Sequence, residues 1–219
     1  MDIKLKKNGV VSSNAFSDSI PIQDMRTTVL SDNSVWALIF EHNCQGGTVL
    51  FTSYSEVMNT QTANKYSRLN ILDRFKGSDG KFEFMLCYPD DTTDYNRWKQ
   101  TNNPCKEYKG TDDSTLTADG YEAISIAWTG SYWGGLARQN SDETDIRNCY
   151  LSGSVGSTYW FYAIGVSATY MTGMPSWTDT GYASTAGRVQ LWVRTDNVPG
   201  MSNASFYKDC ITAHDFIEI

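Results

Sequence analysis

The feature that most constrains the fold of this chain is a set of short segments in which apolar and polar side chains alternate. In Lys81–Tyr88 the side chains of Phe82, Phe84 and Leu86 fall on one face, and Arg188–Arg194 alternates in the same way. A period of two residues is that of a β-strand with one buried and one solvated face. The sequence therefore predicts strands in these two segments and in four others: Ser34–Glu41, Thr48–Tyr54, Tyr121–Trp128 and Thr158–Gly165.

The turn residues between these segments predict how the strands pair, and the spacing of apolar residues predicts how they pack. The segments Ser34–Glu41 and Thr48–Tyr54 flank a Gly-Gly pair, which predicts a hairpin. Thr62–Phe75 carries apolar residues at helical spacing and ends before Gly77, which predicts one helix, although its polar first half is equally compatible with a loop. We expect one common core from six inward-facing side chains: Phe82, Phe84, Leu86, Val189, Leu191 and Val193.

The fold class follows from the number of strands and the scarcity of helix. We expect a mainly β protein, namely an antiparallel β-sandwich of the jelly-roll or lectin-like kind, with one minor helix. Long polar segments separate the strands at Pro89–Asp119, Gln139–Gly156 and Ala168–Gly187. Loops of this length on a sheet scaffold commonly carry function or oligomer contacts.

The composition excludes several classes of partner. A formal net charge of −7 over 219 residues argues against nucleic acid or an anionic lipid surface as the main partner. No stretch approaches the roughly 18 apolar residues that a membrane-spanning helix needs, so we expect no membrane insertion. Charged residues make up 20% of the chain and aromatic residues 13%. This balance suits a β-protein with a carbohydrate-contacting surface.

The cysteines predict free thiols rather than a disulfide framework. The five cysteines are odd in number, irregular in spacing and without a CxxC motif, which favours a chain made in a reducing cytoplasm. Two pairs, His42 with Cys44 and Cys210 with His214, offer the residue types of a zinc site. The pairs are far apart in sequence and lack a short knuckle, so packed thiols are the favoured interpretation. The five are Cys44, Cys87, Cys105, Cys149 and Cys210.

The segment Tyr95–Pro104 concentrates the chemistry of a sugar site. Aromatic rings can cover the apolar face of a sugar while Asn, Gln and Arg bond its hydroxyls. A second aromatic group precedes Gly134–Gly135, where backbone can approach a ligand or another subunit closely. The alternative is that Trp98 closes one end of the fold while asparagines cap turns. The candidate glycan-binding residues are Tyr95, Asn96, Arg97, Trp98, Gln100, Asn102, Trp128, Tyr132 and Trp133.

Catalytic and metal chemistry find less support in the sequence. It contains no G-x-S-x-G, H-E-x-x-H, P-loop or G-x-G-x-x-G motif. A glycosidase needs two carboxyl groups across a cleft, one with a raised pKa, and no acidic residue stands in an apolar setting clearly suited to that role. The acidic groups at Asp90–Asp94, Asp112–Asp113 and Asp142–Asp145 could ligate calcium, but solvated acidic loops are commoner. We therefore expect no enzyme activity, no cofactor and no metal.

Seven segments, taken in order, resemble a known family. The pattern is similar to that of fibre or receptor-binding domains in virion proteins of tailed bacteriophages, notably crAss-like and other gut phages. The resemblance covers roughly Gly80–Arg194, about half of the chain, and it implies a virion surface protein without assigning a catalytic residue. The segments are Gly80–Asp90, Tyr95–Pro104, Gly120–Ile124, Trp133–Ala137, Tyr159–Gly165, Gly173–Pro175 and Val189–Arg194.

The two ends of the chain carry alternating apolar residues that predict attachment strands. Ile3 and Leu5 alternate with lysines near the start, and Ile211, Phe216 and Ile217 stand near the other end. Exposed strands of this kind pair readily with other chains by strand addition. We expect an N-terminal attachment segment at 1–22, a β-sandwich body at 23–204 and a C-terminal attachment segment at 205–219.

These observations lead to one expected function and two alternatives. We expect a bacteriophage virion protein, a head or tail fibre or decoration component, made in the host cytoplasm and located in the virion. Its expected partners are other virion proteins and further copies of itself, with host surface glycan as the candidate ligand. The alternatives are a purely structural capsid or tail component without a ligand and a carbohydrate-active enzyme.

Overall fold

The computed structural model is a mainly β protein, which confirms the expected fold class. Eight strands form one antiparallel sheet and two short strands form a separate antiparallel pair. The structure describes residues 25–45, 49–90, 94–106, 117–127, 133–138, 151–153, 187–199 and 201. Neither of the two helices within these ranges has the length or apolarity of a membrane-spanning helix.

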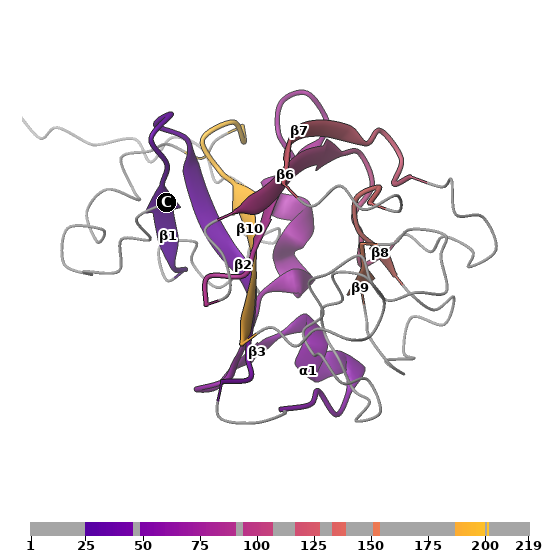
Figure 1. The fold of residues 1–219 in the computed structure, drawn as a ribbon. Helices are drawn as coiled ribbons and strands as arrows, with labels where there is room; N and C mark the ends of the chain where they lie inside the picture. The colour runs from indigo at the N-terminus through magenta and orange to yellow at the C-terminus, as the bar shows by residue number, and fades with distance from the viewer. Residues whose placement is uncertain are drawn as a thin grey trace, which may run out of the picture.

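The large sheet has the strand order β3-β4-β2-β10-β5-β6-β7, with β1 also paired to β2 (Figure 1). The last strand in sequence, β10, therefore lies in the middle, between β2 and β5. The strands are β1 Thr27–Val29, β2 Val35–Asn43, β3 Thr60–Gln61, β4 Lys65–Ser67, β5 Phe82–Cys87, β6 Tyr95–Gln100, β7 Glu122–Ile126, β8 Ala137–Arg138, β9 Leu151–Ser152 and β10 Arg188–Arg194. The helices are α1 Tyr54–Met58 and the 3-10 helix η3 Leu69–Phe75.

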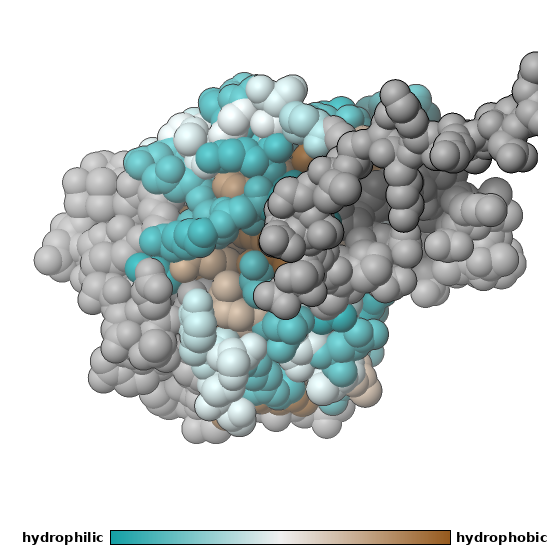
Figure 2. Space-filling model, turned by 180° about the vertical axis from the view of Figure 1, so that it is seen from behind, coloured by the Kyte–Doolittle hydropathy of each residue, from teal (hydrophilic) through white to brown (hydrophobic). Residues whose placement is uncertain are grey.

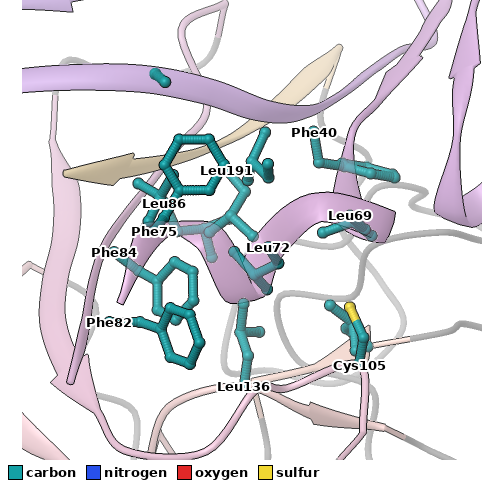
Figure 3. Packing of buried hydrophobic residues seen from close by; sticks show 14 of the residues in the cluster. Phe40, Leu69, Leu72, Phe75, Phe82, Phe84, Leu86, Cys105, Leu136 and Leu191 are labelled. Atoms are coloured by element: carbon teal, nitrogen blue, oxygen red, sulfur yellow. The ribbon is translucent and has the colours of Figure 1, made fainter. Parts of the chain in front are cut away.

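One face of the large sheet packs on η3 to form the main core. In Figure 3, Leu69, Leu72 and Phe75 of η3 lie among Phe84 and Leu191 of the sheet. The β8–β9 pair adds Leu151 and the neighbouring Leu136 to the same cluster. The predicted inward residues are confirmed, because each is at most 1% exposed and belongs to this core: Phe82, Phe84, Leu86, Val189, Leu191 and Val193.

In the central strands β2, β5 and β10 the other face is buried as well, which corrects the expectation that one face of each strand is wet. On β10, Gln190 and Trp192 are only 6% and 5% exposed. Trp192 belongs to a second apolar cluster, which is interleaved with polar side chains of the same face. The members of that cluster are Trp36, Leu38, Tyr66, Met85, Cys87 and Trp192.

The predicted hairpin partner of β2 is wrong. The described part of Thr48–Tyr54 is not a strand, and α1 begins at Tyr54 with Ser53 as its N-cap. The Ser53 hydroxyl accepts a hydrogen bond from Glu56 N at 3.2 Å, and the Glu56 carboxylate accepts one from Thr52 N at 2.7 Å. This reciprocal capping satisfies free N–H groups at the helix start and favours a helix there. The strands β1 and β4 pair with β2 in place of the predicted partner.

The predicted helix over Thr62–Phe75 is correct only in its second half. Tyr66 and Ser67 pair with Glu41 and Phe40 of β2, so the polar first half contributes β4. The helix begins at Leu69 and is of the 3-10 type. The expected end before Gly77 is confirmed, since η3 ends at Phe75.

The sandwich itself stays a prediction. The second large sheet that a sandwich requires is not present within the described ranges, where helices and the β8–β9 pair cover the main core. Three predicted elements lie outside the described residues: the strand at Thr158–Gly165 and the attachment segments 1–22 and 205–219.

Candidate ligand-binding site

The segment Tyr95–Gln100, predicted as a loop, is a strand of the large sheet. It forms β6, which pairs with β5 on one side and β7 on the other. A strand directs successive side chains to opposite faces. The candidate residues Asn96, Trp98 and Gln100 therefore point into the main core and are fully buried. Tyr95 and Arg97 point to the opposite face of the sheet, which carries the second apolar cluster and which we call the second face. The predicted single site is therefore divided between the main core and the second face.

Trp98 is part of the core rather than an exposed sugar platform. Its ring packs at 5.4 Å from Phe84 and edge-to-face on Trp133 at 4.9 Å, measured between centroids. The side chain is 0% exposed, so no ring face is free for a ligand. The structure does bring Trp98 and Trp133 together, but in the packing role of the alternative interpretation.

Gln100 joins β6 to the segment before β8. Its Oε1 accepts hydrogen bonds from Trp98 Nε1 at 2.9 Å and from Leu136 N at 3.1 Å. Its Nε2 donates to the backbone oxygens of Asn102 at 2.9 Å and Leu136 at 3.1 Å. The buried side-chain amide of Gln100 therefore pairs with the backbone of Leu136 as a peptide group of a neighbouring strand would. Gly135, whose φ is +94°, lets the backbone come this close to Gln100 because glycine has no Cβ.

The two candidate asparagines also have structural partners. Asn96 Oδ1 accepts from Ala127 N at 2.9 Å, which continues the pairing beyond β7. Asn102 Nδ2 donates to Asp119 Oδ2 at 2.6 Å, at the opposite end of the β6–β7 pair. Both asparagines therefore hold the two strands in register. Trp128 and Tyr132 lie outside the described residues.

The second face carries a chain of ion pairs, which we call the charge ladder: Asp32, Glu83, Arg97, Arg194 and Asp196. Arg97 donates to Glu83 at 2.7 Å and to Asp32 at 2.8 Å. Arg194 Nη1 lies 3.2 Å from Glu83 Oε2, and its Nη2 donates to Asp196 at 2.8 Å. Glu83, which is 2% exposed, is therefore held between two arginines, as a buried carboxylate requires.

The outer end of the ladder is shaped by a tight turn before β2. Asn33 adopts a positive φ of 63° there, and Asp32 accepts a hydrogen bond from Ser34 N at 2.9 Å. Hydrogen bonds from Ser34 and Arg97 hold the pKa of Asp32 well below its usual range. The Arg97 guanidinium also lies 5.1 Å from the ring centroid of Trp36, a cation–π contact.

The ladder offers polar groups to a ligand only at its rim. The side chain of Asp32 is 47% exposed, whereas that of Arg97 is 12% exposed and fully engaged. Arg194 is intermediate at 26%. A carboxylate and a guanidinium at the rim can bond hydroxyls of a sugar. The partners of Arg97 were not predicted from the sequence. The available signal was Glu83, which lies between Phe82 and Phe84 in a buried strand, because a buried carboxylate needs a cation as its partner.

His42 and Cys44 lie together, as one half of the zinc set considered above. His42 Nε2 is 3.4 Å from Cys44 Sγ and 2.5 Å from the carbonyl oxygen of Val49. Because a carbonyl only accepts, Nε2 carries the hydrogen and donates to Val49. Burial lowers the pKa of His42 to about 4 and raises the pKa of the Cys44 thiol. Both groups are therefore neutral near pH 7, and the pair lacks an activated thiolate.

Metal-ligating groups do not gather elsewhere in the described ranges. Within them, no three His, Cys, Asp or Glu side chains could hold a metal ion together. Asp90 is engaged by Arg188, whose Nη2 and Nε donate at 2.6 and 3.1 Å. Cys44, Cys87 and Cys105 carry free thiols. Two further cysteines and His214 lie outside the described residues.

Comparison with known proteins found no relative of this chain: no family model and no curated protein matches it.

Proposed function

We propose that this chain is a structural component of a tailed-bacteriophage virion, a fibre or decoration subunit of the head or tail that assembles with copies of itself and other virion proteins. One observation carries the proposal. Of the seven segments that carry the resemblance to phage fibre domains, five fall in described residues, and these five build β5, β6, β7, the start of β8 and β10. The segments that carry the resemblance therefore contribute four strands of the large sheet, β5, β6, β7 and β10.

The ligand of the proposed subunit is host surface glycan. The core positions Asn96, Trp98 and Gln100 belong to the scaffold of such a site. Contact with the sugar is assigned to Trp128 and Tyr132, in the segment between β7 and β8. The rim of the charge ladder provides polar groups of the kind that bond sugar hydroxyls.

A purely structural subunit without a ligand is the second candidate. The observation that favours it is the complete burial of Trp98, the ring on which the sugar hypothesis first depended. The hydrolase alternative is less well supported. A glycosidase general acid needs an apolar setting. The two glutamates that are buried in the described ranges, Glu41 and Glu83, instead contact arginines at 2.8 and 2.7 Å.

Glycan-array binding of the full chain tests the ligand, with Trp128→Ala and Tyr132→Ala as variants. We expect binding by the wild type, its loss in both variants, and unchanged thermal unfolding. Wild-type binding that both variants retain would move the site elsewhere. No binding at all would leave the purely structural role, and release of reducing sugar would support the hydrolase. Immunogold labelling of phage particles tests the virion location separately.

A further inference from the structure

We propose that the open edge of β7 accepts a strand from a second copy of this chain, namely its lysine-rich first segment, Met1–Lys7. The inference rests on the proposed assembly role and specifies the joint between two subunits. Strand addition at a sheet edge gains main-chain hydrogen bonds for affinity and side-chain contacts for specificity.

The position of β7 makes it a receiving edge. It is the last strand in the order of the large sheet and pairs with β6 on one side only, among the strands that the structure describes. Its length is five residues, whereas β3 at the opposite end of the order has two. Short edge strands resist pairing with other chains, and longer ones invite it.

The side chains of β7 are unusually accessible for a strand. Glu122, Ala123, Ile124 and Ser125 are all exposed, so neither face of the strand is covered at these positions. Ile124 is 43% exposed and, with Val29, is one of two large hydrophobic residues exposed in the described ranges. The register shift against β6 leaves Ile124 without a partner there. An added strand would cover it.

Charge selects the lysine-rich segment as the occupant. Residues 117–127 contain two carboxylates, Asp119 and Glu122, and no lysine or arginine. Glu122 forms an exposed ion pair with Lys81 at 3.0 Å, and an added lysine would share this carboxylate. Met1–Lys7 contains three lysines and one aspartate. A second β7 would instead bring the same two carboxylates and no cation, and like charges on neighbouring strands are unfavourable. Opposite charge also speeds and orients association.

In an added strand, Ile3 and Leu5 would share one face with Lys7, and Lys4 and Lys6 would share the other with Asp2. Glu122 pairs with Lys99 and so shares the face of the charge ladder, whereas Ile126 pairs with Asn96 and packs against the main core. An added strand with Lys4 and Lys6 on the charge-ladder face places these lysines beside Glu122. The apolar residues Ile3 and Leu5 then lie on the face of Ile126, where they extend the core. Among the residues coloured in Figure 2, which shows the molecule from behind, hydrophilic side chains predominate and the hydrophobic patches are small.

Self-association of the full-length protein tests this joint. We expect sedimentation velocity to show concentration-dependent oligomers, and hydrogen exchange to show protection of residues 122–126 that increases with protein concentration. Ile124→Lys should weaken association at least about tenfold. Val29→Lys is the matched control, because it makes the same change at the other exposed hydrophobic residue, on β1. A wild type that stays monomeric, or equal association of Ile124→Lys and wild type, would overturn the proposal.

Charge reversal identifies the occupant even if Ile124→Lys fails to fold. A chain with Lys4 and Lys6 changed to Glu should lose association, and mixing it with a Glu122→Lys chain should restore it. Failure of that rescue would exclude Met1–Lys7 as the added strand. Protection of β7 that does not increase with protein concentration would also overturn the proposal, because pairing with β6 already protects part of this strand within one chain. Because these readouts use purified protein, they can fail while particle labelling still supports the virion role.

Discussion

The central strands of the large sheet, β2, β5 and β10, are buried on both faces, but by different chemistry. On the η3 face, β5 contributes Phe82, Phe84 and Leu86 to a continuous apolar cluster. On the opposite face the same strand contributes Glu83 beside Met85, and the glutamate is held by two arginines. The first face is stabilised by removal of apolar area from water and by close packing. The second depends on each buried charge keeping its partner.

This difference shows what an alternating strand does and does not specify. Alternation determines which residues share a face, but a polar residue on the second face is not necessarily solvated. Glu41, Glu83 and Gln190 are all buried on this face. Gln190 Nε2 donates to Glu41 at 2.5 Å, so these polar groups are satisfied across β2 and β10. The two faces should therefore respond differently to substitution.

The largest effect is expected for a cavity on the apolar face. Phe84→Ala should lower the free energy of unfolding by roughly 3–5 kcal/mol, because the ring is fully buried and its removal also costs packing with its neighbours. Urea denaturation measures the loss. Ile124→Ala, on the exposed edge, should change stability by less than about 0.5 kcal/mol. Equal effects of the two substitutions would mean that this face is not the main core.

A pH-dependent loss of stability is expected from His42, which lies edge-on to the core residue Phe51 at 5.0 Å. Its pKa is lowered from 6.5 to about 4 in the folded protein by burial. The unfolded chain therefore binds the proton first, and stability falls as pH decreases from about 6.5 to about 4. The difference corresponds to about 3 kcal/mol.

Stability of the wild type and of His42→Gln, measured across this pH window, isolates the histidine. We expect the variant to lose most of the slope, whereas Cys44→Ser should retain it because the thiol does not titrate there. A slope that is unchanged in His42→Gln would assign the pH dependence to carboxylates instead.

The strands that could be predicted from sequence are those with apolar residues at every inward position. For β5 and β10 the inward residues are all apolar, so local alternation sufficed. In β6 two of the three inward residues are Asn96 and Gln100, and the apolar alternation is broken. Their hydrogen-bond partners, Ala127 and Leu136, are 31 and 36 residues away. No local pattern reveals that a buried amide will be satisfied.

The expected exposure of Trp98 was wrong for the same reason. An Arg-Trp pair among amides has the composition of a sugar site, and only the pairing of β6 on both sides shows that the tryptophan is interior. The partners of Arg97 are 14 and 65 residues away in sequence, at Glu83 and Asp32. Contacts at such separations depend on strand order, which the sequence pattern did not specify.

Gln100 provides an intermediate case, a polar group within the apolar face. Gln100→Leu keeps the approximate volume but leaves Trp98 Nε1 and both backbone groups of Leu136 without this partner. We expect a loss of roughly 2–3 kcal/mol, the cost of unpaired buried polar groups. Asn102→Ala, which removes a more exposed hydrogen bond to Asp119, should cost less than about 1 kcal/mol by the same denaturation measurement. A neutral Gln100→Leu would show that water or another group replaces the amide.

The smallest effect is expected on the second face, where the charge ladder has redundant partners. Glu83→Gln removes the carboxylate between Arg97 and Arg194, but Arg97 keeps Asp32 and Arg194 keeps Asp196. Removing one partner of an isolated buried pair typically costs about 3–5 kcal/mol because a bare charge remains. Since no bare charge remains here, we expect a loss of roughly 1–2 kcal/mol, close to that of one charged hydrogen bond.

The matched control is Glu122→Gln, which makes the same chemical change at the exposed salt bridge with Lys81, where the glutamate side chain is 56% exposed. A surface pair of this kind contributes at most about 1 kcal/mol and weakens with added salt. The Glu83 effect should persist in high salt, because its ion pairs are largely shielded from solvent, whereas any Glu122 effect should vanish. A loss of 3 kcal/mol or more in Glu83→Gln would contradict the redundancy. It would mean that the ladder behaves as one cooperative network, in which removal of the central carboxylate also releases Asp32 and Asp196 from their arginines.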